Sequence, residues 1–148
     1  MAHLAQVLTR EERDEFLAQP HIGALSVDSG DDDRAPVTVP VWYRYEPGGD
    51  LWVMTAADSR KARLIAAAGR FSLMVDRVVP TVRYVSVEGP VVATSDATPE
   101  ELEEITRHYL VDPVKVEEYL AFARREHGPQ LVVRMRPQRW LSAELGEE

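Results

Sequence analysis

The residues with the clearest potential for chemistry are Ser59, Arg60 and Lys61, where a β-favouring segment changes to a helical pattern. The first N–H groups of a helix lack partners within the helix, and the helix dipole adds partial positive charge there. Arginine can hold a phosphate through two parallel hydrogen bonds, lysine adds a mobile charge, and serine adds a hydroxyl donor. Cations in a first helical turn oppose the dipole, so they need another reason to be there. The junction therefore predicts an anion site; the alternative is a solvated helix start with ordinary surface bases.

The charge of the chain is unevenly spread. The 148 residues carry a formal net charge of -8, yet between residues 51 and 95 lysine and arginine outnumber aspartate and glutamate six to three. The overall negative charge disfavours nucleic acid and anionic membrane surfaces as partners. The local excess of bases supports an anion site within an acidic protein.

Several kinds of site are excluded by what the sequence lacks. There is no cysteine, which removes disulfides, thiolate nucleophiles and zinc–cysteine sites, so redox chemistry would need a bound cofactor. The four histidines have no metal-ligand spacing, and no GxSxG, GxGxxG or GxxxxGK[ST] motif occurs. The N-terminal segment is charged and helical in pattern and lacks the apolar stretch of a signal peptide, which predicts a cytoplasmic location.

Local patterns predict the elements that must position this junction. Thr9 with Glu12, and Thr98 with Glu101, have the spacing of a capping box and predict helix starts. Pro40 predicts that its strand lies at a sheet edge or carries a bulge, because proline cannot donate to a ladder. The predicted strands are 22–27, 37–45, 51–56, 71–77, 82–94, with a bulge or bend at Gly89 and Pro90, and 130–145; the predicted helices are 9–19, 58–69 and a pair within 98–128.

This order of elements favours one architecture. We expect an α+β fold, mainly β with helices, in which short strands joined by tight turns form a partly open antiparallel barrel. Residues 1–148 are predicted to form a single domain with a helical hairpin inserted at about 98–128. No internal repeat or low-complexity linker divides the chain.

The segment VMTAADSRKARLIAAAGRFSLMV, followed by RYVSVEGPVV, resembles the pyridoxamine 5'-phosphate oxidase superfamily over approximately residues 20 to 95. The resemblance implies a split antiparallel β-barrel of the FMN-binding type, forming a homodimer with a flavin-type cofactor at the subunit interface. It also implies that Ser59, Arg60 and Lys61 hold the cofactor phosphate, with Thr55 in support. Further residues that it implies as cofactor contacts are Pro40, Val41 and Trp42, along the ring, and Arg83 and Tyr84, reaching across from the partner subunit. For Trp42 the alternative is a cover on the outside of the barrel, and for Tyr84 it is interface packing.

The resemblance leaves two cofactors open. The chain is shorter than the vitamin-making oxidases and lacks their C-terminal substrate segment, so pyridoxal phosphate synthesis is not expected. It looks closer to small members with a PVWY strand and an SRKAR helix start, many of which use the deazaflavin coenzyme F420 in place of FMN. The polyglutamate tail of F420 needs additional cations, which favours F420 over FMN here. The arginines available for that tail are Arg44, Arg63, Arg77 and Arg83.

The resulting prediction is an oxidoreductase in which a bound F420 or FMN passes a hydride to a small conjugated acceptor. No acid or base stands out in the sequence, and the proton would come from Tyr84 or solvent, because the cofactor carries the difficult step. The alternative is a non-catalytic flavin-binding or cofactor-carrier module. Both functions need the same anion site at the junction.

Overall fold

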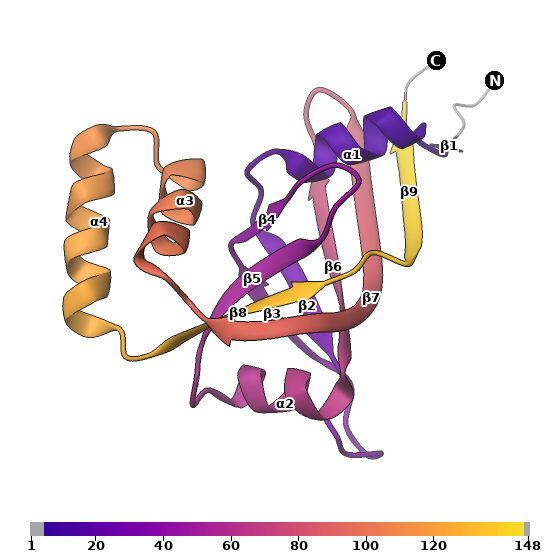
Figure 1. Cartoon of the computed structure of the whole chain (residues 1–148). Coiled ribbons are helices and arrows are strands. Elements are labelled where there is room, and N and C mark those ends of the chain that lie inside the picture. The colour runs from indigo at the N-terminus through magenta and orange to yellow at the C-terminus, as the bar shows by residue number, and fades with distance from the viewer. Residues whose placement is uncertain (1–4, 147–148) are drawn as a thin grey trace.

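The computed structural model describes residues 5–146 (Figure 1). The helices are α1 (Arg10–Ala18), α2 (Arg60–Ala68), α3 (Pro99–Tyr109) and α4 (Pro113–Glu126). The strands are β1 (Ala5–Gln6), β2 (Gly23–Val27), β3 (Val37–Val41), β4 (Tyr43–Tyr45), β5 (Leu51–Ala56), β6 (Arg70–Arg77), β7 (Val82–Asp96), β8 (Gln130–Met135) and β9 (Arg139–Leu145). No helix among these residues is long and apolar enough to cross a membrane.

The strands form one curled antiparallel sheet with the order β3-β2-β6-β7-β8-β5-β4. The long strand β7 pairs with β6 and β9 along its first part and with β8 along its second part. The two ends of the order, β3 and β4, follow each other in the chain with only Trp42 between them. The two edge strands are therefore joined by the chain without pairing with each other, and the predicted split antiparallel β-barrel with helices is confirmed.

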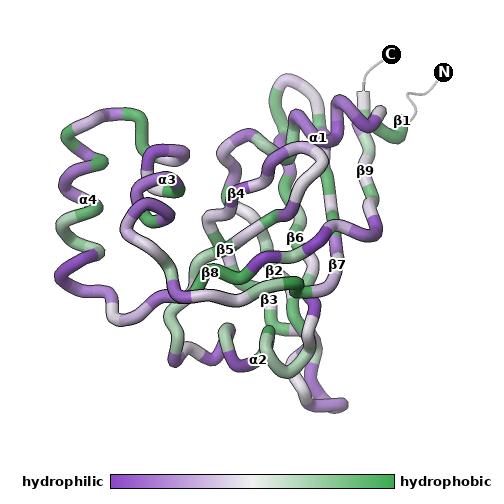
Figure 2. Tube along the Cα trace, viewed as in Figure 1, coloured by the Kyte–Doolittle hydropathy of each residue, from purple (hydrophilic) through white to green (hydrophobic). Residues whose placement is uncertain are grey.

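The main core fills the inside of this barrel. Alternate residues of the strands point inward, as in β2, where every second residue is buried. Helix α1 contributes Phe16 and Leu17, which are 1% and 0% exposed, to the same apolar cluster. Burying each such side chain stabilises the fold by about 1.5–3 kcal/mol. Figure 2 shows hydrophobic stretches along the barrel strands and a hydrophilic loop between β2 and β3.

The predicted helix starts are confirmed. The Thr9 hydroxyl accepts from the Glu12 N–H at 3.1 Å, while the Glu12 carboxylate accepts from the Thr9 N–H at 2.9 Å. The same reciprocal pair joins Thr98 and Glu101 at the start of α3. The pair α3–α4, here called the hairpin, lies between β7 and β8 in the chain and stands beside the barrel in Figure 1.

Two predicted strands are wrong in their extent. The segment 37–45 is one strand by pattern, but it divides at Trp42 into β3, which pairs with β2, and β4, which pairs with β5. The segment 130–145 divides between Met135 and Arg139: β8 pairs with β5 and the second part of β7, whereas β9 pairs with the first part of β7 and with β1. In 37–45 the alternation continues through the break, because both halves bury the same face. In 130–145 it does not, because β8 buries both Val132 and Val133 while β9 is more exposed. The edge position predicted from Pro40 is confirmed, since β3 ends the sheet order.

Glycine at position 89 is required by a close approach of two chain segments. A Cβ built on Gly89 would lie 1.8 Å from the carbonyl oxygen of Arg136. Backbone hydrogen bonds hold this crossing, from the Arg136 N–H to Pro90 and from the Gln138 N–H to Glu88. The irregularity predicted at Gly89 and Pro90 lies slightly later, as a shift of register between Val91 and Ala93.

Candidate functional site

Helix α2 begins directly after β5, and Ser59 caps it. The Ser59 hydroxyl donates to the Ala56 carbonyl at 2.8 Å and accepts from the Ala62 N–H at 3.1 Å. The Thr55 hydroxyl, on a buried residue of β5, lies 3.1 Å from the same oxygen. Gly69 ends the helix with a positive φ of 73°. Thr55 and Ser59 thus fix the strand-to-helix junction, and their hydroxyls already have partners within it.

The two cations of the junction have different surroundings. Arg60 is exposed, whereas Lys61 is half-buried. Burial lowers the pKa of the Lys61 ammonium below its ordinary value. Among residues 5–146, neither side chain has a carboxylate partner within 4.0 Å. A half-buried cation without a partner is unfavourable unless something anionic meets it.

Lys61 lines a cavity of about 220 Å³, here called the Lys61 cavity. Its wall includes Pro40, Val41 and Trp42, which are the other residues expected along a cofactor ring. The structure thus brings together four sequence-predicted site residues from two separate elements. The remaining lining residues come from β5, the hairpin and the start of β8: Met54, Leu102, Ile105, Tyr119, His127 and Gln130.

Trp42 is held between the barrel and the hairpin. Its ring stacks on Tyr109 with centroids 4.7 Å apart and an interplanar angle of 7°, and Tyr119 lies against it at 5.3 Å. One face of the indole is therefore covered by α3. Trp42 lies outside the barrel core, as expected for a cover on the barrel, and it also lines the Lys61 cavity, where a contact with a cofactor ring is expected.

The Tyr109 hydroxyl fastens the connection between β3 and β4. It accepts from the Tyr43 N–H at 3.0 Å and donates to the His21 carbonyl at 2.7 Å. Burial raises the pKa of Tyr109 to about 12, so the hydroxyl stays protonated and able to donate at neutral pH. Through this contact, α3 fixes the position of the cavity wall formed by Pro40, Val41 and Trp42, here called the Trp42 wall. No local pattern in the sequence signals this role.

A second part of the hairpin contact involves Arg44 and His108. Arg44 donates to His108 Nδ1 at 2.7 Å and forms an ion pair with Glu104 at 3.1 Å. Because arginine cannot accept, His108 is neutral with its proton on Nε2, and this buried atom has no partner among the described residues. Burial is the largest cause that lowers the pKa of His108, followed by the charge of Arg44.

Arg83 and Tyr84 lie on β7, next to β9, and line neither the Lys61 cavity nor its neighbour. Arg83 donates to Glu144, which also pairs with Arg77 at 3.7 Å. Hydrogen bonds from Thr81 and Arg83 lower the pKa of Glu144. Three of the four arginines considered for an anionic tail, namely Arg44, Arg77 and Arg83, thus have carboxylate partners within the chain.

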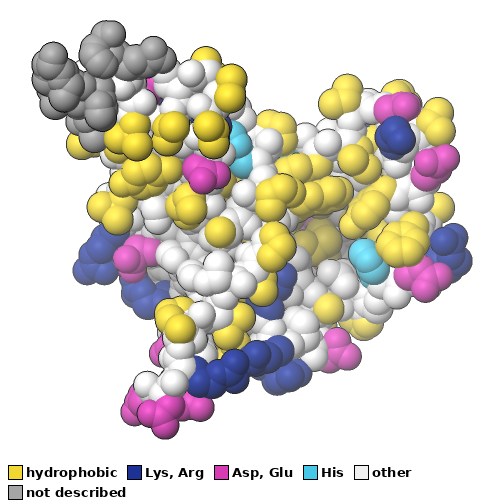
Figure 3. Space-filling view, turned by 180° about the vertical axis from the view of Figure 1, so that it is seen from behind, with side chains coloured by type: hydrophobic (Ala, Val, Ile, Leu, Met, Phe, Trp, Pro, Cys, Tyr) yellow, Lys and Arg dark blue, Asp and Glu magenta, His cyan; other side chains and the backbone are white. Residues whose placement is uncertain are grey.

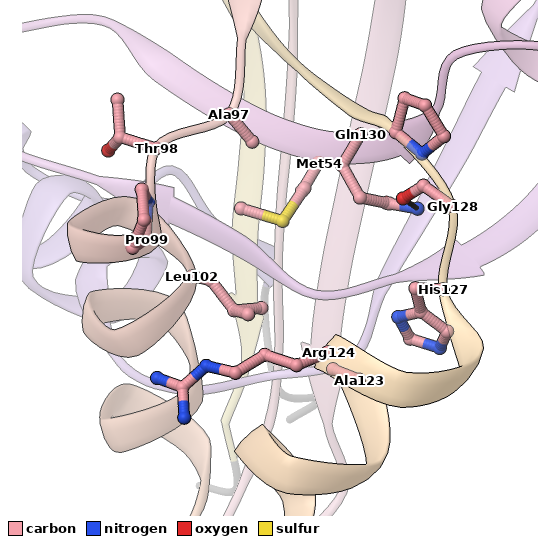
Figure 4. A pocket seen from close by; sticks show the side chains of 11 residues that line it. Met54, Ala97, Thr98, Pro99, Leu102, Ala123, Arg124, His127, Gly128 and Gln130 are labelled. Atoms are coloured by element: carbon pink, nitrogen blue, oxygen red, sulfur yellow. Dashed lines mark hydrogen bonds between the residues drawn. The ribbon is translucent and has the colours of Figure 1, made fainter.

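A larger cavity of about 370 Å³ adjoins the Lys61 cavity and is here called the hairpin cavity (Figure 4). The two share Met54, Leu102, His127 and Gln130 in their walls. Figure 3 shows hydrophobic side chains gathered in the hollow between the helical pair and the barrel. These lining residues were missed by sequence reasoning, because they meet only through the packing of α3 and α4 against β5 and β8.

Comparison with known proteins gives a consistent result. A family model described as pyridoxamine 5'-phosphate oxidase matches residues 9–143. A conserved hypothetical protein from Mycobacterium tuberculosis is similar in structure, with 22% identity, a TM-score of 0.67, and coverage of 93% of this chain and 86% of that one. A FAD-binding protein from Mesorhizobium loti has 18% identity, a TM-score of 0.64, and coverage of 97% and 99%. A structure described as an F420 reductase has 20% identity, a TM-score of 0.58, and coverage of 86% and 94%. No curated protein matches the sequence.

Proposed function

Because the chain belongs to the pyridoxamine 5'-phosphate oxidase family, we propose that it is an oxidoreductase that binds a phosphorylated flavin or deazaflavin coenzyme at the Lys61 cavity. Its acceptor would be a small conjugated molecule. The observation that carries the proposal is that Lys61, a half-buried cation, shares one cavity with Trp42 and the strand before it. A flat aromatic ring with an anionic extension matches a wall of this kind.

Different residues of the chain would contact the phosphate and the ring of the coenzyme. The first N–H groups of α2 with Arg60 and Lys61 would meet the phosphate, and Thr55 and Ser59 hold that helix start in place. The backbone of Pro40 to Trp42 would lie along the ring, and the hairpin would exclude water from it. When bound in its reduced form, the coenzyme supplies a hydride to the acceptor, which takes the balancing proton from solvent.

The size of the Lys61 cavity supports a shared site. At about 220 Å³ it is small for a whole flavin nucleotide, so part of the coenzyme would extend beyond it. A homodimer in which Arg83 and Tyr84 come from the second copy would supply the remaining contacts. Arg83 would then have to keep or exchange its bond to Glu144. A dimer is therefore part of the proposal.

Two coenzymes remain candidates, FMN and F420. The relatives described as a FAD-binding protein and as an F420 reductase support the class of coenzyme. With Arg44, Arg77 and Arg83 paired, the cations that remain for a polyglutamate tail near the junction are Arg60 and Arg63. Arg63 is exposed and donates to the Asp58 carbonyl at 2.7 Å.

The deciding experiment is an anaerobic fluorescence titration of the purified protein with FMN and, separately, with F420. The double variant Arg60→Ala/Lys61→Ala is expected to weaken binding by about 2–4 kcal/mol, because charge-assisted hydrogen bonds to the phosphate are lost. Lys115→Ala is the matched control, since Lys115 is exposed on α4 and lines neither cavity. Equal affinity in the double variant and the control would remove the proposed site.

Turnover is tested separately, by mixing the protein with reduced coenzyme and a panel of conjugated acceptors without oxygen. Oxidation of the coenzyme that depends on both protein and acceptor supports the oxidoreductase. Tight binding without oxidation by any acceptor would instead indicate a coenzyme-carrier module.

A further inference from the structure

The two adjoining cavities have a cation at each end. Lys61 lines only the Lys61 cavity, Arg124 lines only the hairpin cavity, and His127 lines both. In Figure 4, Arg124 extends from α4 toward α3 below Leu102, while His127 and Gln130 lie across from it. The hollow beside the barrel thus offers two separate places for negative charge.

Arg124 differs from the arginines around it. Arg125 pairs with Glu126 at 3.1 Å, Arg107 pairs with Glu103 at 2.8 Å, and Arg134 pairs with Glu101 at 2.9 Å. Arg124 has no carboxylate within 4.0 Å among residues 5–146. Its guanidinium is therefore available to a ligand, and its planar fork suits a carboxylate.

The remaining wall of the hairpin cavity is mostly apolar. Leu102 and Ala123 come from the hairpin, Met54 comes from β5, and Ala97 and Pro129 come from the connections to β7 and β8. Besides Arg124, the polar side chains are Thr98, whose hydroxyl accepts from the Glu101 N–H, and His127 and Gln130, which also line the Lys61 cavity. A few polar groups in an apolar wall fix the orientation of a small organic molecule.

We propose that the hairpin cavity binds the acceptor, and that the acceptor is a small, mostly apolar molecule carrying one carboxylate or comparable anion, which Arg124 holds. This inference rests on the proposed function, because it places the acceptor beside a coenzyme in the Lys61 cavity. The shared residues Met54, Leu102, His127 and Gln130 form the boundary between the two. Arg124 could instead bind the anionic tail of F420. The experiment must therefore distinguish an anionic acceptor from the F420 tail as the ligand of Arg124.

The test uses the coenzyme-free protein and the fluorescent probe 8-anilinonaphthalene-1-sulfonate, which joins an apolar aromatic body to one anion. The neutral analogue N-phenyl-1-naphthylamine lacks the sulfonate. We expect Arg124→Gln to weaken binding of the sulfonate probe about five- to tenfold and to leave the neutral analogue unchanged, because one charge-assisted contact is lost. Arg125→Gln is the matched control on the same helical turn, and it should leave both probes unchanged.

The coenzymes are then added to the probe-loaded protein. Binding of FMN without displacement of the probe supports two separate compartments. Displacement of the probe by F420 but not by FMN would assign Arg124 to the coenzyme tail and overturn the acceptor proposal. Equal loss in Arg124→Gln and Arg125→Gln, no probe binding, or competition between probe and FMN would also overturn it.

Failure of the proposed function has a different signature, namely that neither FMN nor F420 binds the protein without probe. In that case the assignment of the hairpin cavity to the acceptor is also wrong, even if the probe binds. Circular dichroism of each variant confirms that the fold is retained before the affinities are compared.

Discussion

At the end of the barrel where β7 meets β9, the arginines are paired with a carboxylate, whereas two cations that line the cavities beside the hairpin have no such partner among residues 5–146. At the β7–β9 end, Arg77 and Arg83 share Glu144, and Thr81 adds a hydrogen bond to the same carboxylate. Beside the hairpin, Lys61 and Arg124 line two cavities without a carboxylate partner among the described residues. Paired cations serve the fold, while unpaired cations in a hollow are available to an external anion.

The two regions also differ in how firmly they are packed. The barrel contains one continuous apolar cluster, from Phe16 on α1 through the strands to Met135 on β8. Among the described residues, the buried members of the second cluster, between the hairpin and the barrel, are Trp52, Ile105 and Val132. Changes in the barrel should therefore affect the whole fold, and changes at the hairpin should affect ligand binding first.

The largest effect is expected from Gly89→Ala, in the barrel. The new Cβ would meet the Arg136 carbonyl, a backbone atom that the hydrogen bonds of the crossing hold in place. We expect a loss of about 3 kcal/mol or more in the free energy of unfolding, measured by urea denaturation. The control is Gly128→Ala, at the end of the hairpin, where a Cβ meets nothing within 4 Å. Similar stability of the two variants would contradict the distinction between a tight barrel and a loose hairpin.

The next effect concerns the contact that joins the two regions, at Tyr109. Tyr109→Phe keeps the stack on Trp42 but leaves the Tyr43 N–H without its partner, which should cost about 1–3 kcal/mol. Tyr109→Leu also removes the aromatic stack, which should add about 0.5–1.5 kcal/mol.

The decisive measurement for Tyr109 is coenzyme affinity. Displacement of the Trp42 wall should reduce the free energy of coenzyme binding by more than it reduces the free energy of unfolding. Arg107→Gln serves as control on the same helix, since Arg107 is exposed, pairs with Glu103 and lines neither cavity. If Tyr109→Phe lowers stability but leaves coenzyme affinity intact, α3 does not position the wall.

A smaller effect is expected at alkaline pH, from Lys61. Because burial lowers its pKa below the ordinary 10.5, Lys61 loses its charge before an exposed lysine does. Coenzyme affinity should therefore begin to fall below pH 10.5, while fold stability should rise over the same range as the buried charge is removed. In Lys61→Arg the charge persists, so affinity measured across this range should stay level. A parallel fall in Lys61→Arg would show that Lys61 does not control binding.

The smallest effect is expected on acidification, from His108, which faces Arg44, Glu104 and His21. Its pKa is lowered in the fold, so the unfolded chain takes up the proton first as the pH falls below about 6.5. Stability should decrease in that range. His108→Asn keeps an acceptor for Arg44 and should reduce the decrease measured by thermal unfolding, unlike His127→Asn. Identical acid profiles for the two variants would exclude His108 as the cause.

Local features of the fold could be predicted from the sequence, and long-range features could not. The capping boxes at Thr9 and Thr98, the Ser59 cap and the Gly69 end depend on a few neighbouring residues, and each is confirmed. The break at Trp42 was missed, because inward and outward residues alternate on both sides of it. What divides the strand is a change of partner, which a local pattern does not encode.

The same distinction applies to the candidate site. The cations Arg60 and Lys61 were found because their position at a helix start is unusual. The contribution of Tyr109 and the hairpin was missed, since these residues lie more than 60 positions from Tyr43, to which they connect. The pairing of Arg83 with Glu144 spans a similar separation and was also missed. Sequence alone therefore indicated where a ligand charge could bind but not which arginines were already occupied.

The free edges of the split sheet have a consequence for how molecules meet in concentrated solution. An exposed edge strand can recruit a strand from another chain, and such recruitment is a route to aggregates. Here β3 carries Pro40, which lacks the N–H that an incoming strand would need, and β4 is only 3 residues long. These two edges are thus poor templates for the addition of a strand from another molecule.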